Sequence, residues 1–262
     1  SLMLKYSPNT LWVSYSSISD FLKCPKLYYL KNIYKDPKSG YKVQIARPPT
    51  TMGDIVHKTL ERVIETPFFE FGETENVYNH LWKVQEGERG GFRTSEEEKD
   101  YHDRGLEMVK RFRDNWDLST HKPIILDFPK AKVFDDAFLV GNVDWLEQTP
   151  DGIFIMDFKT GKNDEKEGSL QLPIYTMLVL SQPQFRGQRV ARWSYWYLRD
   201  AKPVDQPIQG FKEAVEKVKT TAAQMKEYRD SHNLTNLSCP VPHGHEVECD
   251  QFEQIIQGKA RF

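Results

Sequence analysis

The chain has 262 residues, of which 39% are hydrophobic and 28% are charged, and its formal net charge is −2 at pH 7. This is the composition of an ordinary globular protein that can bury a substantial core, and no apolar run is long enough to span a bilayer. The small net charge excludes nucleic-acid binding through overall charge, so any such binding has to be local. No secretory signal pattern is visible, and we expect a cytoplasmic protein without a membrane partner.

The first 120 residues show mainly helical patterns. Helices are predicted over 16–33, 51–65, 75–85 and 95–116, from apolar residues that recur at helical spacing. Pro25 marks a break between two helical pieces in the first of these. The second is amphipathic, has Thr50 or Thr51 as a candidate cap, and carries His57 close to its apolar side.

The pattern changes period after Pro123. Three runs rich in β-branched and aromatic residues, separated by turn signals, predict a three-stranded antiparallel meander. The runs are residues 123–134, 137–148 and 152–160. A helix over 168–182, a fourth strand over 189–200 and a long helix over 211–232 are predicted to follow.

This order of elements predicts an α/β or α+β fold with a mixed central sheet flanked by helices. We expect a single domain over residues 3–262. It would comprise a mainly helical region (14–120), a catalytic sheet with its helix (121–200), and a C-terminal helix followed by a Cys/His tail (201–262).

The stretch GIFIMDFKTG, residues 152–161, ends a strand with Asp157 and Lys159 on one face, because side chains on a strand alternate. Across the predicted hairpin, Asp144 can face Asp157. Two close carboxylates repel unless a proton or a cation lies between them, and Mg²⁺ or Mn²⁺ takes such oxygen ligands. The plainer alternatives are a surface ion pair and an aspartate that caps a turn.

Four motifs in order resemble a known family. They are Gly53-x-x-x-His57, Gly141-Asn-Val-Asp144, Ile155-Met-Asp157-Phe-Lys159-Thr-Gly161 and Gln171-Leu-Pro-Ile-Tyr175. Together they look like the RecB-type branch of the PD-(D/E)XK nuclease superfamily, from about Ser14 to Arg199. The resemblance implies a restriction-endonuclease-like core, with an additional N-terminal helical region.

The resemblance also implies roles for individual residues. His57, Asp144, Asp157 and the Phe158 carbonyl would hold a catalytic Mg²⁺ or Mn²⁺. Lys159 would position or polarise the attacking water. Gln171 and Tyr175, neighbours on one helix face, would support the lysine and the DNA backbone. The alternatives are that His57 is a packed histidine and that Tyr175 belongs to the core.

Local positive charge gathers early in the chain. Basic residues with interleaved tyrosines, including Lys26, Tyr28, Lys31 and Lys35, suggest a track for a single strand of nucleic acid. A solvated helix face explains the same pattern.

Cysteines suggest a second, structural metal site. Members of the branch often bind an iron-sulfur cluster through one early and three late cysteines. This chain has Cys24, Cys239 and Cys249, with His243 or His245 as a candidate fourth ligand, a set that also suits Zn²⁺. The alternative is a buried cysteine and a simple loop.

We therefore expect a metal-dependent DNA nuclease, acting on single strands or DNA ends in repair, recombination or CRISPR adaptation. The sequence has no phosphate-binding loop of a helicase motor, so unwinding would come from a helicase or CRISPR adaptation partner. The alternatives are a catalytically silent DNA-binding subunit and a zinc-stapled interaction module.

Overall fold

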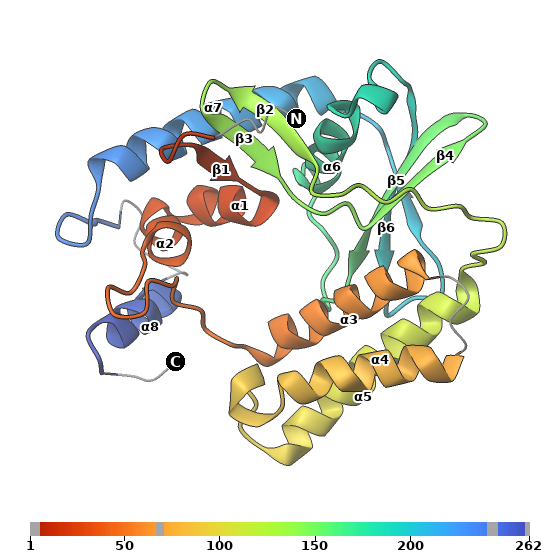
Figure 1. The fold of residues 1–262 in the computed structure, drawn as a ribbon, viewed down its shortest axis with the longest axis horizontal. Helices are drawn as coiled ribbons and strands as arrows, with labels where there is room; N and C mark the ends of the chain where they lie inside the picture. Colours follow the sequence, from red (N-terminus) through yellow and green to blue (C-terminus); the bar gives the residue numbers. More distant parts are fainter. Residues whose placement is uncertain (1–5, 67–70, 240–245, 260–262) are drawn as a thin grey trace.

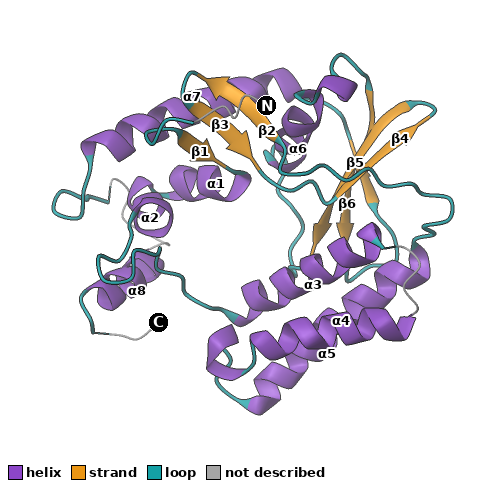
Figure 2. Cartoon of the chain, in the orientation of Figure 1, coloured by secondary structure: helices purple, strands orange, loops and turns teal. Residues whose placement is uncertain are grey.

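The computed structural model describes residues 6–66, 71–239 and 246–259, which form eight α-helices and seven β-strands (Figures 1 and 2). The helices are α1 (Tyr15–Lys23), α2 (Pro25–Tyr28), α3 (Pro48–Glu65), α4 (Phe71–Val84), α5 (Ser95–Asn115), α6 (Gln171–Leu180), α7 (Phe211–Ser231) and α8 (Glu246–Ile256). The strands are β1 (Leu11–Val13), β2 (Lys130–Phe134), β3 (Ala137–Val140), β4 (Trp145–Thr149), β5 (Gly152–Lys159), β6 (Val190–Tyr197) and β7 (Val204–Gln206). No helix among the described residues is long and apolar enough to cross a membrane.

A four-stranded sheet has the strand order β4-β5-β6-β7. Strand β5 runs antiparallel to β4 and parallel to β6, so the sheet is mixed, as predicted. The residues of β5 from Ile153 to Phe158 are buried, because both faces of this strand are covered. Met156 and Phe158 pack in a core with α3, α4 and α5, whereas Ile153 and Ile155 pack in a second core with α6.

A second sheet, in the order β1-β3-β2, lies beside α6 and α7 (Figure 1). Its buried side chains, among them Val13, Val133 and Leu139, share a core with α1, α6 and α7. At the other end of the chain, α8 packs against α2 through Cys249 and Phe252.

The predicted three-stranded meander is wrong. The run 137–148 is not one strand but two, since β3 pairs with β1 and β2 while β4 pairs with β5 in the other sheet. The break falls between Val140 and Trp145. There the Phe158 N–H donates to the Asp144 carboxylate at 2.9 Å, so a side chain takes a hydrogen bond that would otherwise extend the ladder.

The predicted helices are confirmed, with changes at their ends. Pro25 is the first residue of α2, where its missing N–H is not needed. Helix α3 starts at Pro48, earlier than predicted, because prolines suit the first turn. Neither candidate threonine caps it: the residue before the helix is Arg47, and Thr51 donates instead to the Gly90 carbonyl.

Candidate active site

The carboxyl end of β5 brings a carboxylate and an ammonium group together on one face of the sheet. Asp157 and Lys159 share the face that looks toward α6, while Met156 and Phe158 fill the opposite core, as the alternation predicts. Asp157 is only 3% exposed. Its Oδ2 atom lies 2.9 Å from Lys159 Nζ.

Asp144 reaches the same place from the break before β4. Trp145 pairs with Met156, so the register sets Asp144 beside Asp157. Burial and the charge of Asp144 raise the pKa of Asp157. Burial acts on Asp144 in the same direction, but the His57 charge and the Phe158 N–H outweigh it and lower the pKa of Asp144.

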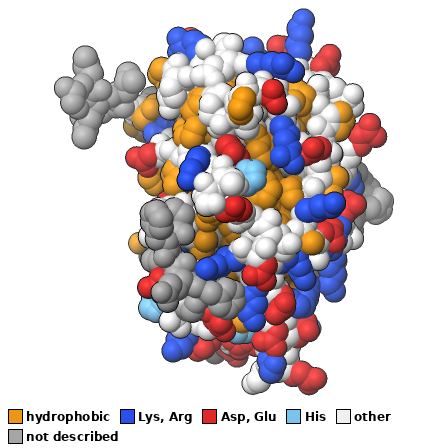
Figure 3. All heavy atoms as spheres, turned by 90° about the vertical axis from the view of Figure 1, so that its right-hand side faces the viewer, with side chains coloured by type: hydrophobic (Ala, Val, Ile, Leu, Met, Phe, Trp, Pro, Cys, Tyr) orange, Lys and Arg blue, Asp and Glu red, His pale blue; other side chains and the backbone are white. Residues whose placement is uncertain are grey.

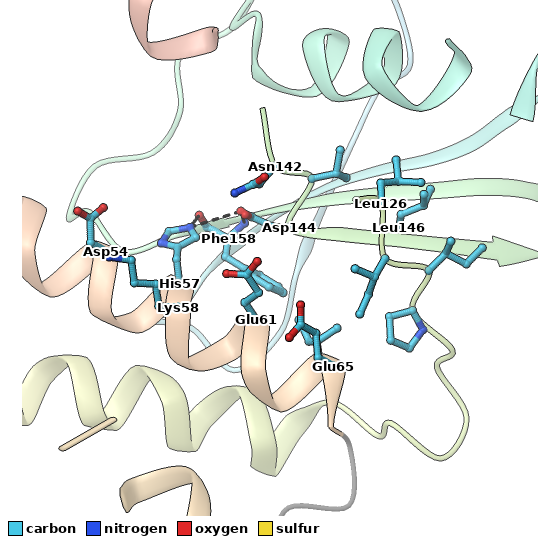
Figure 4. Close-up of a pocket in the computed structure, with 15 residues that line it drawn as sticks. Asp54, His57, Lys58, Glu61, Glu65, Leu126, Asn142, Asp144, Leu146 and Phe158 are labelled. Carbon is cyan, nitrogen blue, oxygen red and sulfur yellow. Dashed lines mark hydrogen bonds and ion pairs between the residues drawn. The ribbon is translucent and has the colours of Figure 1, made fainter. Parts of the chain in front are cut away.

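His57 extends from α3 to the end of β5 (Figure 4). Its Nε2 lies 3.0 Å from the Phe158 carbonyl oxygen and 3.4 Å from Asp144 Oδ2, and its Nδ1 lies 2.9 Å from the Gly53 carbonyl oxygen. Carbonyl oxygens only accept, so both ring nitrogens donate and the ring is cationic. Burial opposes this state, but the Asp144 charge outweighs burial and raises the pKa of His57.

Gly53 explains how α3 comes so near the strand. A Cβ at this position would lie 2.8 Å from Thr160 Oγ1, closer than van der Waals contact allows. Gly53 therefore lets α3 lie close to the end of β5, and this closeness lets His57, one turn later, reach the Phe158 carbonyl.

Lys159 lies between two carboxylates. Besides Asp157, its Nζ contacts Glu165 Oε2 at 3.3 Å, and the rings of Tyr15 and Tyr195 lie 5.6 Å from it. Burial favours the neutral amine, but Asp157 and Glu165 outweigh burial and raise the pKa of Lys159. The two carboxylates therefore favour the cationic form of the amine.

Helix α6 adds Tyr175 to the site. Burial and the charges of Asp144 and Asp157 raise the pKa of Tyr175, whose hydroxyl faces both carboxylates. Gln171 is buried at the first position of the same helix, and its backbone N–H donates to Ser169 Oγ at 3.3 Å. The structure thus brings one residue or more of each of the four motifs to one location, whereas the role of the Gln171 side chain stays a prediction.

The donors fit a hard divalent cation. Asp157 Oδ2 is buried and, apart from its ion pair with Lys159, lacks a hydrogen bond of ordinary geometry. Asp144 Oδ2 and the Phe158 carbonyl oxygen both lie near the proton on His57 Nε2, so they form a small group of oxygen donors around a positive charge. The other ring nitrogen of His57 donates to the Gly53 carbonyl, as the second nitrogen of a metal-binding histidine usually does. In the described ranges no three His, Cys, Asp or Glu side chains form a ready metal cage. Mg²⁺ needs none, since it is held by one or two carboxylates and keeps waters.

A cavity of about 260 Å³ opens beside these groups. Figure 4 shows Asp54, Glu61 and Glu65 along α3 on one side, with Leu126 and Leu146 on the other. Figure 3 shows apolar side chains gathered in the middle of the face that carries β4, with charged side chains around them. The site is therefore reached through a hollow that is apolar on one side and acidic on the other.

The basic block is largely engaged within the protein. Lys26 lies 2.7 Å from Glu253, and Lys31 lies 3.3 Å from Asp20 and 3.6 Å from Glu248. Tyr28 is 1% exposed, so its ring has no free face for a base. Lys35 is exposed. Nucleic-acid binding by this block stays a prediction. The ion pairs to α8 argue against it, because they already neutralise part of the positive charge.

The three cysteines approach one another at the junction of α2 and α8. Cys24 Sγ lies 3.9 Å from Cys239 Sγ, and Cys249 packs in the same core as Cys24. His243 and His245 lie outside the described residues. A structural metal here stays a prediction, whether iron-sulfur or Zn²⁺.

Sequence reasoning did not identify Glu165 or Tyr15 as part of the site. Glu165 sits in a polar loop where every residue type looks solvated, and Tyr15 opens a helix 142 positions before Asp157. No spacing rule links them to β5. Only the folded chain shows that both meet Lys159.

Comparison with known proteins identifies the family of the chain. None of the curated proteins compared with the chain matches it. The sequence does match the PD-(D/E)XK nuclease superfamily, a superfamily of metal-dependent nucleases, over residues 12–251. That span contains β2 to β7, all of β1 except Leu11, and every motif residue described above. The chain belongs to the PD-(D/E)XK nuclease superfamily.

Proposed function

We propose that the protein is a Mg²⁺- or Mn²⁺-dependent deoxyribonuclease of the RecB-like branch. The observation that carries the proposal is the meeting of Asp144 and His57 beside the Phe158 carbonyl, with Asp157 next to Asp144 and paired with Lys159. Two buried carboxylates next to a cationic amine are costly to keep in a fold unless they serve a purpose. The GxxxH helix and the buried Gln171 and Tyr175 on α6 support the assignment to this branch.

Each residue has a role in phosphodiester hydrolysis. Asp144, Asp157, the Phe158 carbonyl and His57, after loss of its Nε2 proton, would hold the metal. When bound, the metal supplies charge stabilisation at the phosphate and a lower pKa for the attacking water. Lys159 is a fixed positive charge that orients this water and stabilises negative charge developing on the phosphate oxygens. Tyr175, with its raised pKa, keeps its proton and donates to the carboxylates.

We further propose that the substrate is single-stranded DNA or a DNA end, and that the protein acts in repair, recombination or CRISPR adaptation. The resemblance of the four motifs to the RecB-type branch supports this. A helicase or a CRISPR adaptation protein would then be the partner that supplies such ends.

The test is a cleavage assay with the full chain. Labelled single-stranded, blunt and flapped DNA, with single-stranded RNA for comparison, is incubated with Mg²⁺, Mn²⁺ or chelator. We expect cleavage of single-stranded DNA or of ends with either metal, and none with chelator. An exonuclease releases nucleotides from the end, so a label placed at each end in turn gives the polarity.

Other outcomes point to the alternatives. DNA binding without cleavage under any metal would indicate a catalytically silent subunit. A preparation that neither binds nor cleaves DNA but contains stoichiometric zinc would indicate an interaction module. Cleavage that persists in chelator would contradict a metal-dependent site.

A further inference from the structure

Glu165 is an inward-facing carboxylate in an otherwise exposed loop. The loop joins β5 to α6, and its residues 161–164 and 166–168 are exposed, whereas the Glu165 side chain is 19% exposed. A loop rich in charged residues does not need to bury one of them, since water solvates all equally well. The burial of this carboxylate therefore has to be offset by contacts.

Three hydroxyl groups fix Glu165 in place. Its Oε1 accepts hydrogen bonds from the Tyr15 hydroxyl at 2.8 Å and the Ser169 hydroxyl at 2.7 Å. Its backbone N–H donates to the Tyr197 hydroxyl at 2.9 Å. Tyr15 belongs to α1 and Tyr197 to β6, whereas Ser169 lies in the same loop as Glu165, two positions before α6. Burial opposes ionisation of Glu165, but the hydrogen bonds and Lys159 outweigh it and lower its pKa.

The free oxygen of the carboxylate is aimed at Lys159. Oε2 lies 3.3 Å from Lys159 Nζ, while Oε1 is occupied by the two hydroxyls. A lysine side chain has several rotatable bonds and loses entropy when it is held in one position. One contact, with Asp157, leaves the ammonium free to turn about it. A second contact on the other side restricts this motion.

We propose that Glu165 is a positioning residue that fixes the Lys159 ammonium beside Asp157 for phosphodiester hydrolysis. This inference rests on the proposed function. Asp157 would share its charge with the metal, which weakens its hold on Lys159, and Glu165 would then keep the amine in place. Tyr15 and Ser169 hold Glu165, so α1 contributes to the site through Tyr15.

The most selective variant is Glu165→Gln. The amide oxygen still accepts from Tyr15 and Ser169, so the loop keeps its anchors, but the negative charge facing Lys159 is lost. We expect kcat to fall about tenfold, as loss of a charged hydrogen bond predicts, with KM for DNA unchanged. Glu165→Asp, which keeps the charge, should recover part of the rate. Glu167→Gln, an exposed residue of the same loop, is the matched control and should behave as the wild type.

A second measurement follows Lys159 itself and needs no nuclease activity. The full chain is treated with an amine-acylating reagent, and modification of Lys159 is followed by mass spectrometry. We expect faster modification in Glu165→Gln than in the wild type or Glu167→Gln, because only the neutral amine is acylated and loss of the Glu165 charge and contact leaves Lys159 easier to deprotonate and to reach. Equal rates in all three proteins would show that Glu165 does not hold the lysine.

The outcomes separate the two proposals. A wild type that cleaves DNA, with a Glu165→Gln variant of equal kcat, would overturn the positioning role and leave the nuclease intact. A raised KM at constant kcat would show that Glu165 acts in DNA binding, which also overturns it. A wild type that never cleaves would overturn both proposals, and the labelling rates would then report only on the contact.

Discussion

The Asp157→Asn protein is expected to lose DNA cleavage while keeping its fold. The substitution preserves shape but removes a charge that would bind the metal. Charge stabilisation by a catalytic metal is worth several kcal/mol, and a loss of about 4 kcal/mol corresponds to roughly a thousandfold in rate. Initial rates on labelled single-stranded DNA at saturating Mn²⁺ measure this loss.

The Asp157→Asn protein should be at least as stable as the wild type, although it loses activity. The pKa of Asp157 is raised in the folded protein, so its ionised form at neutral pH is less favourable there than in the unfolded chain. An uncharged asparagine also removes repulsion with Asp144. We therefore expect a melting temperature in metal-free buffer equal to or above that of the wild type. An unfolded Asp157→Asn protein, or a folded one that cleaves DNA normally, would contradict this account.

The Lys159→Met protein is expected to lose both activity and stability. Methionine fills much of the same volume but leaves Asp157 and Glu165 without their shared cation. Loss of charged hydrogen bonds at a half-buried position should lower the free energy of unfolding by on the order of 2 kcal/mol. Loss of the charge at the phosphate should reduce kcat by about a hundredfold or more. Cleavage rates and denaturant unfolding measure the two effects.

Lys166→Met is the matched control for this substitution. Lys166 is exposed in the loop that carries Glu165, and its side chain is not part of the site. It should change neither the rate nor the midpoint of unfolding. Retained cleavage in Lys159→Met would show that the ammonium has no role in the reaction, and unchanged stability would show that its two ion pairs contribute nothing.

Opposite stability changes in the two variants would be informative. A simple surface ion pair between Asp157 and Lys159 predicts that removing either partner costs the same small amount. If Asp144 instead repels Asp157 and Lys159 relieves this repulsion, the Asp157→Asn variant should gain stability and the Lys159→Met variant should lose it. The burial of Asp157 favours the second case.

Local patterns in the sequence predict most of the elements that build this site. The alternation along 152–159 indicates that Asp157 and Lys159 share a face, and thirteen positions separate Asp144 from Asp157 in a way that suits a hairpin. Helical spacing places His57 near the apolar side of its helix. These predictions depend on short-range geometry, which residue order determines directly.

Long-range features were not predictable in the same way. Whether β3 continues into β4 depends on which sheet each strand joins, and β1, the partner of β3, lies more than 120 positions earlier. The basic block looked free because its partners on α8, Glu248 and Glu253, are more than 200 residues away in the chain. The contacts of Glu165 were hidden for the same reason, since two of its three hydroxyl partners belong to the distant elements α1 and β6.

The central claim is that Asp144 and Asp157 bind one shared divalent cation. Titration of Mn²⁺ into the metal-free chain, followed by electron paramagnetic resonance of the free ion, tests it without reference to DNA. The account predicts one Mn²⁺ per chain in the wild type, and binding weakened at least about tenfold in both Asp144→Asn and Asp157→Asn, but not in Lys166→Met. Equal Mn²⁺ binding by the wild type and the Asp144→Asn, Asp157→Asn double variant would contradict it.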